Sequence, residues 1–169
     1  VFFEIINISL EKILSFNDSF NIYFFRHLTN CLFFLIASIY FYYTLNSFYP
    51  KLVSILGFLL FIIHPRIFAQ SFYNSKDIIF LVFFCISNYY LIKFFIYQRI
   101  KHLFLLSFII ALTIGTRVMG IIVPVLFILF FVLENLEKNK YKNIYLIIPF
   151  IVFTLSLSIN SLYMYIWIK

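Results

Sequence analysis

The residues best suited to chemistry lie in one polar stretch, residues 64–77, between two long apolar segments. The stretch combines a histidine, an arginine, a lysine and a carboxylate with two carboxamides, a tyrosine and two serines. Arginine and lysine bind phosphate oxygens, and a carboxylate can accept the proton of an attacking hydroxyl group. A second polar segment, residues 115–117, ends in another arginine. The candidate residues are His64, Arg66, Tyr73, Asn74, Lys76, Asp77 and Arg117.

The composition places these residues in an integral membrane protein. Of the 169 residues, 64% are hydrophobic and only 11% are charged, with a mean hydropathy of +1.06. A soluble domain of this length cannot bury so much apolar surface. Membrane topology and anionic lipid or phosphate ligands account for the net charge of +7. No basic patch interleaves with aromatic residues in a soluble segment, so nucleic acid is not an expected partner.

The hydrophobic pattern predicts an all-α fold, a polytopic bundle of about six membrane segments. Residues 1–18 carry polar side chains in steps of three and four, which predicts an amphipathic helix lying in the membrane interface. Cys31 and Cys85 lie in apolar runs without metal-ligand spacing and are expected to be packing residues. We expect membrane helices at 22–47, 52–63, 78–97, 103–115, 118–133 and 144–168.

The positive-inside rule orients these helices. The loops on both sides of the segment 103–133 are basic, with Arg99 and Lys101 before it and Lys140 and Lys142 after it. Both loops can lie in the cytoplasm only if the segment reverses at 115–117, so we favour two helices over one. Residues 64–77 and 115–117 would then both face the outer side.

Short helices should hold both polar segments at membrane depth. Twelve helical residues span about 18 Å, well short of the ~30 Å hydrocarbon core. One charged side chain facing lipid at mid-membrane costs roughly 2.5–3.5 kcal/mol, so four would cost on the order of 10 kcal/mol. We therefore expect Arg66, Lys76, Asp77 and Arg117 to face one shared cavity, with His64 beside them.

Each candidate residue also has a purely structural interpretation. Asp77 would stabilise the start of the helix that follows it, and Arg66 and Arg117 would snorkel or pair with Asp77. His64, before a proline, would be a turn residue, as would Tyr73 and Asn74. The sequence leaves these alternatives open.

The motifs resemble a known family. Three motifs together resemble those of bacterial membrane glycosyltransferases of the GT-C superfamily. They are Arg26-His27-Leu28, the stretch from His64-Pro65-Arg66 to Lys76-Asp77, and Thr116-Arg117-Val118-Met119-Gly120. The chain is most similar to the dolichyl-phosphate-mannose-protein mannosyltransferase-like family, which includes transferases that modify lipid A and lipopolysaccharide core.

The resemblance implies a polyprenyl-phosphate-linked sugar as the donor, inversion at the anomeric carbon and a site on the outer face. By the same resemblance Asp77 matches an acidic position, while Arg66, Lys76 and Arg117 match cationic positions near the donor phosphate. We expect His64, from the same polar stretch, to bind the phosphate with them. In the family the principal carboxylate lies early in the first outer loop, a position that we expect upstream of residue 1; Glu4 lies near that position but is not equated with it. We therefore expect an N-terminal-half fragment. Expected at the periphery of the site are Arg26, His27, Glu4, Tyr73 and Asn74.

The sequence thus predicts a glycosyltransferase of the bacterial plasma membrane with its site on the periplasmic face. Its partners would be membrane lipids, the sugar donor and a lipid, glycan or protein acceptor. No metal-ligand cluster is predicted, and the pattern does not decide whether a divalent metal is needed. A transporter or flippase for an anionic lipid or solute is the alternative, since it would use the same buried cations. A non-catalytic membrane fragment is the third hypothesis.

Overall fold

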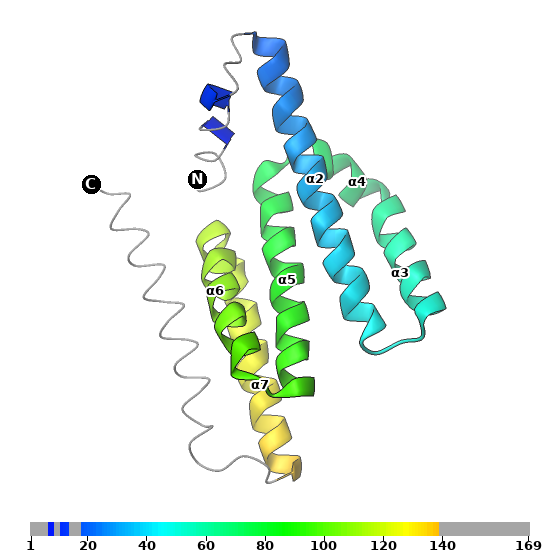
Figure 1. Ribbon diagram of the computed structural model, residues 1–169, viewed down its shortest axis with the longest axis vertical. Helices are drawn as coiled ribbons and strands as arrows, with labels where there is room; N and C mark the ends of the chain where they lie inside the picture. The colour runs from blue at the N-terminus through cyan, green and yellow to red at the C-terminus, as the bar shows by residue number, and fades with distance from the viewer. Residues whose placement is uncertain (1–6, 9–10, 14–17, 139–169) are drawn as a thin grey trace, which may run out of the picture. The chain divides into compact units, whose positions relative to one another are not determined.

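The computed structural model describes residues 7–8, 11–13 and 18–138, and every regular element among them is helical. The chain forms two compact units, residues 1–85 and 86–169. Helix α5, Ser75–Tyr97, runs from the first unit into the second. The all-α fold is as predicted (Figure 1).

Helices α2, Ser19–Asn46, and α3, Lys51–Ile63, form an antiparallel hairpin in the first unit. Phe61 of α3 stacks on two rings of α2, with centroid distances of 5.8 Å to Phe34 and 4.6 Å to Phe41. Aromatic pairs of this kind add to the stability gained by burying their area. The predicted bounds of these helices were 22–47 and 52–63.

The polar stretch after α3, which we left between two predicted helices, contains a helix of its own. Helix α4, Pro65–Tyr73, begins with a proline, which suits the first helical position because its missing N–H would have no partner there. His64 before it is extended, with φ −55° and ψ 114°, and α4 bends away from α3 by 57°. Residues 65–73 thus form a helix that the sequence analysis did not predict, and helix α5 begins at residue 75 rather than 78.

The second unit contains the remainder of α5, helix α6 (Ile100–Thr116), the short helix η1 (Val118–Ile121) and helix α7 (Ile122–Lys138). The chain reverses at Arg117, and Figure 1 shows α6 and α7 running in opposite directions. For residues 103–133 we favoured two helices over one long helix, and the structure contains two. In the core of the unit, Phe127 of α7 lies 5.6 Å from the rings of both Phe94 and Phe95 in α5.

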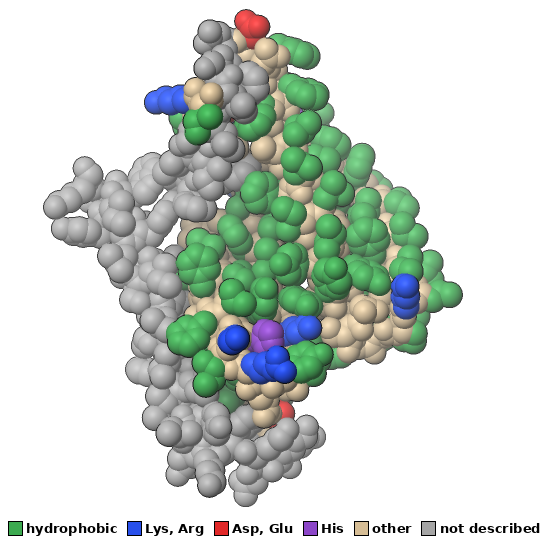
Figure 2. Space-filling view, in the orientation of Figure 1, with side chains coloured by type: hydrophobic (Ala, Val, Ile, Leu, Met, Phe, Trp, Pro, Cys, Tyr) green, Lys and Arg blue, Asp and Glu red, His purple; other side chains and the backbone are tan. Residues whose placement is uncertain are grey.

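The described helices suit a membrane. Both α2 and α5 are long and apolar enough to span one, the bent pair α3–α4 would make a third span, and α6 and residues 118–134 are shorter apolar helices. Figure 2 shows hydrophobic side chains over most of the described surface in that view. It also shows lysine and arginine side chains around a histidine. The last predicted helix, 144–168, lies outside the described residues.

Candidate polar site at the start of the first long helix

The break between α4 and α5 is organised by Asn74. Its backbone N–H ends α4 by donating to Gln70 O at 2.9 Å, and its side-chain oxygen accepts the N–H of Asp77 at 3.2 Å. Its side-chain amide in turn donates to the Asp77 carboxylate. This reciprocal pair is a helix cap, because it satisfies an amide that has no partner within the first turn. Asp77 is therefore held at the start of α5 in an orientation that Asn74 sets.

Two residues of α2 satisfy a carbonyl that α4 leaves open at its end. The Nδ1 atom of His27 donates to the Phe72 carbonyl, and Nδ2 of Asn30 donates to the same oxygen at 3.4 Å. The last carbonyls of a helix have no partner within it, so such donors stabilise its end. Because a carbonyl only accepts, Nδ1 of His27 carries the proton; in a neutral ring Nε2 is then an acceptor. The end of α4 is thus tied to α2.

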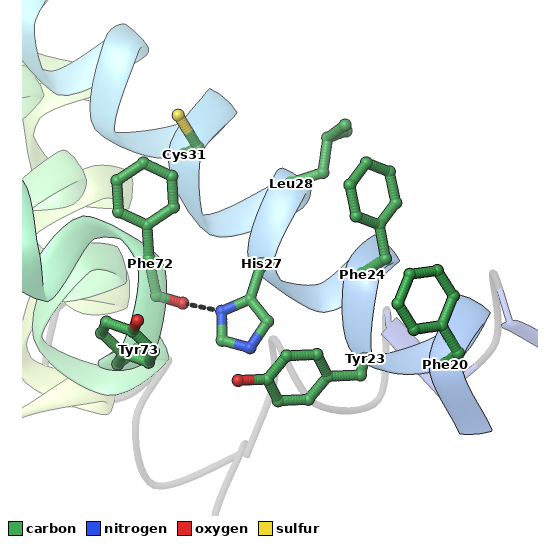
Figure 3. Close-up of a pocket in the computed structure, with 8 residues that line it drawn as sticks. All are labelled: Phe20, Tyr23, Phe24, His27, Leu28, Cys31, Phe72 and Tyr73. Carbon is green, nitrogen blue, oxygen red and sulfur yellow. Dashed lines mark hydrogen bonds between the residues drawn. The ribbon is translucent and has the colours of Figure 1, made fainter.

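Aromatic rings enclose His27. The Tyr23 ring lies 4.0 Å from the imidazole and the Tyr73 ring 5.4 Å from it, both edge-on. Figure 3 shows the imidazole between these two tyrosines, with its hydrogen bond to Phe72. The three rings form a wall that borders two cavities on the first unit.

The first cavity is apolar and has a volume of about 420 Å³. Beyond the shared wall its lining is hydrocarbon and aromatic, apart from one thiol, and Figure 3 shows these side chains along α2 and at the end of α4. A lining of this kind suits an aliphatic chain. Its other lining residues are Phe20, Phe24, Leu28, Cys31 and Phe72.

The second cavity, called the polar cavity because its lining is more polar than that of the first, has a volume of about 370 Å³. Two of its lining residues, Asn7 and Asn30, are almost fully buried, at 5% and 4% exposure. The side-chain oxygen of each has no hydrogen-bond partner among the described residues. Buried polar atoms are nearly always paired in proteins, so these two oxygens are exceptions to a general rule. Its other lining residues are Ile8, Tyr23, Arg26, His27, Tyr73 and Ser75.

A bidentate ion pair lies at the edge of the polar cavity. Arg26 donates from Nε and Nη2 to the two carboxylate oxygens of Glu11, at 2.6 Å and 3.0 Å. This hydrogen bonding lowers the pKa of Glu11 below its ordinary value of 4.5. Partial burial opposes the shift, and the positive charge of Arg26 adds to it. The pair joins the segment before α2 to α2 itself and neutralises the formal charge of Arg26.

The structure brings together only part of the predicted site. Arg26, His27 and Tyr73 line the polar cavity. Asn74, which follows Tyr73 in the sequence, donates a hydrogen bond to Asp77. The exposed residues of the predicted phosphate cluster line neither of these two cavities. These residues are His64, Arg66 and Lys76.

Arg117 is exposed and belongs to the second unit, so its convergence with the first-unit cations stays a prediction. Glu4 lies outside the described residues. In the part of the chain that the structure describes, no three histidine, cysteine or acidic side chains gather as metal ligands would.

The sequence-based site omitted Asn7 and Asn30, and each had a detectable signal. Asn30 follows His27 by three residues, which places both on one face of a helix. Asn7 belongs to the polar stripe of residues 1–18. Neither residue is charged, so an argument based on cations did not select them.

The sequence model of a protein family named dolichyl-phosphate-mannose-protein mannosyltransferase matches residues 7–165. No curated protein matches the chain. No solved structure matches it either.

Proposed function

We propose the function from this premise: the chain belongs to the dolichyl-phosphate-mannose-protein mannosyltransferase family, a family of GT-C membrane glycosyltransferases. The match over residues 7–165 is the observation that carries the proposal. The proposed reaction is transfer of a sugar from a polyprenyl-phosphate donor to a lipid, glycan or protein acceptor. We place it at the outer face of a bacterial plasma membrane, in a transferase of the lipid A or lipopolysaccharide-core type.

The two cavities beside His27 support an amphipathic donor. The apolar cavity, with Phe20, Phe24 and Leu28, suits part of a prenyl chain, while the polar cavity next to it suits a hydrophilic group. Because Tyr23, His27 and Tyr73 border both cavities, one ligand can contact both at once. A polyprenyl-phosphate sugar has this division into an apolar chain and a polar head.

The proposed chemistry is displacement at the anomeric carbon. An acceptor oxygen attacks that carbon, the bond from the carbon to the phosphate oxygen breaks, and the lipid phosphate leaves with the bonding pair. Arg66, Lys76, Arg117 and His64 would stabilise the leaving phosphate, since guanidinium and ammonium groups offset negative charge that develops in the transition state. A carboxylate takes the acceptor proton; Asp77 orients the site or assists this step. A divalent metal is not assigned.

Transfer of labelled sugar by the full-length protein in membrane vesicles tests the function. A panel of polyprenyl-phosphate sugars would be the donors, and labelled product would be measured. Arg66→Ala and Arg117→Ala should each abolish transfer while the protein stays folded, and Lys101→Ala, in a predicted cytoplasmic loop, is the matched control. Wild-type transfer in both arginine variants would refute the phosphate assignment. Movement of the donor across the membrane without transfer would favour a transporter instead.

A further inference from the structure

Basic side chains gather where α5 ends and α6 begins, and Figure 2 shows them around a histidine over this junction. Lys93 lies one helical turn before the end of α5, Arg99 lies in the link between the helices, and Lys101 lies in the first turn of α6. The sequence contains no acidic residue between Asp77 and Glu134. Among the described residues these three cations form no ion pair. We call Lys93, Arg99 and Lys101 the basic cluster.

Two tyrosine rings hold Lys93. Its ammonium nitrogen lies 4.9 Å from the centre of the Tyr97 ring and 5.4 Å from the centre of the Tyr89 ring. At such distances the face of an aromatic ring attracts a cation. The Tyr97 ring also lies 6.2 Å from the ring of His102, in the first turn of α6. Tyr97 therefore connects a cation of α5 to the start of the next helix.

The length of α5 places the basic cluster among lipid headgroups. The helix has 23 residues and is apolar enough to span a membrane. At 1.5 Å per residue it covers about 35 Å, slightly more than the ~30 Å hydrocarbon core. Its end at Tyr97 then lies at the level where tyrosines are enriched and where lysine side chains reach the interface. The positive-inside rule assigns this end to the cytoplasmic leaflet, whose surface is negative.

Exposed apolar side chains adjoin the cations. Ile96 follows Lys93 by three residues, and Phe104 follows Lys101 by three, spacings that place each pair on one face of its helix. Ile96 is 51% exposed and Phe104 is 64% exposed. A free phosphate ion gains nothing from apolar contacts. A phospholipid, in contrast, presents a phosphate and acyl chains next to each other, as this surface requires.

We propose that the basic cluster binds the phosphate of an anionic phospholipid, with the acyl chains along the exposed apolar side chains of α5 and α6. The Arg99 guanidinium and the Lys93 and Lys101 ammonium groups bind the phosphate oxygens. A zwitterionic phospholipid fits less well, because its own cationic group is repelled by the cluster. This binding is a function separate from sugar transfer, and its test needs neither a sugar donor nor an acceptor.

Native mass spectrometry of the full-length protein, released from detergent, measures the binding. The probes are dioleoylphosphatidylglycerol and dioleoylphosphatidylcholine, which have the same acyl chains, and ammonium phosphate is the competitor. Each cation near an anionic lipid changes the affinity about 5-fold, so the three should make phosphatidylglycerol bind at least about 10-fold more tightly than phosphatidylcholine. Equal affinities would overturn the proposal. Displacement of the lipid by ammonium phosphate would indicate a site for free phosphate and would also overturn it.

Charge variants locate the binding. Arg99→Gln should weaken phosphatidylglycerol binding about 5-fold, and Arg99→Gln combined with Lys101→Gln about 10- to 30-fold. Both positions are exposed, so the fold should be unaffected. Lys51→Gln, at an exposed position in the first turn of α3 on the same predicted side, is the matched control and should bind like the wild type. Equal losses in Lys51→Gln and Arg99→Gln would indicate diffuse attraction and refute a defined site.

A variant without a charge change separates a defined site from diffuse attraction. Tyr97→Leu removes a ring that holds Lys93 and should weaken phosphatidylglycerol binding about 2- to 5-fold, the factor expected for one exposed cation–π contact. Tyr49→Leu is the matched control, because Tyr49 is exposed to the same extent, 54% against 53% for Tyr97. Unchanged binding by Tyr97→Leu would contradict the proposal.

Discussion

Two of the breaks between helices in this chain are built in opposite ways. The break between α4 and α5 depends on side chains: Asn74 caps α5, and His27 and Asn30 reach from α2 to the Phe72 carbonyl. The break between α6 and η1 depends on a missing side chain. A Cβ atom on Gly120 would lie 2.7 Å from the Thr113 carbonyl carbon, so only glycine allows the backbone to fold back this closely.

The hydrogen bonds at the second break run within the segment itself. Arg117 N–H donates to Thr113 O at 3.1 Å, and Gly120 N–H donates to Arg117 O at 2.9 Å. The Thr116 hydroxyl donates to Thr113 O at 2.8 Å. The comparison shows that one break is a tertiary feature, which packing against α2 completes, and the other is largely a local one. A cavity with unpaired polar atoms accompanies the first.

Adding a methyl group should damage the second break most. Gly120→Ala should destabilise the full-length protein by about 1–3 kcal/mol, the usual cost of forcing an extra carbon into a packed site. Thermal unfolding in detergent would measure it. Gly115→Ala is the matched control, because Gly115 is exposed in α6 and alanine favours a helix. Equal stability of the two variants would show that the close approach at Gly120 is unimportant.

Removing a side chain should damage the first break, by a smaller amount. Asn74→Ala loses the cap on the Asp77 amide and should lower the free energy of unfolding by about 1 kcal/mol. Asn74→Ser, which keeps a capping oxygen, should recover most of this loss. The same thermal unfolding assay applies to both variants. No difference between them would mean that the cap does not hold this break.

Charge at the edge of the polar cavity should have the smallest effect. The pKa of Glu11 is lowered in the folded protein, so its pairing with Arg26 stabilises the fold above about pH 4.5 and is lost as the pH falls through the lower folded-state value. About half of the Arg26 side chain is exposed (51%), and solvent screens such pairs to about 0–1 kcal/mol.

Glu11→Gln tests that pair by unfolding measured as a function of pH. The variant should match the wild type at the lowest pH and be slightly less stable at neutral pH. A variant whose deficit grows as the pH falls would contradict this sign. Lys12→Gln, which changes an exposed neighbouring charge, is the control.

The predictions from sequence succeeded where one physical effect dominates. A composition that is 64% hydrophobic leaves an all-α membrane protein as the reasonable fold. The stretch at residues 64–77 was harder, because its polar residues suit either a turn or a short helix. Pro65 indicated a helix start, but the weight of polar side chains favoured a turn, and α4 is a helix. The structural interpretation of Asp77 as a helix-start residue describes its contacts with Asn74.

The sequence by itself determined the membrane class, most of the helical elements and the family resemblance, because hydrophobicity, periodicity and motifs are properties of neighbouring residues. Only the tertiary structure decided that Asn7 and Asn30, 23 positions apart, line one cavity, and that His27 meets the end of α4, 45 residues away in sequence. An uncharged asparagine gives no local sign of being buried without a partner. That property arises only when other segments of the chain pack around it.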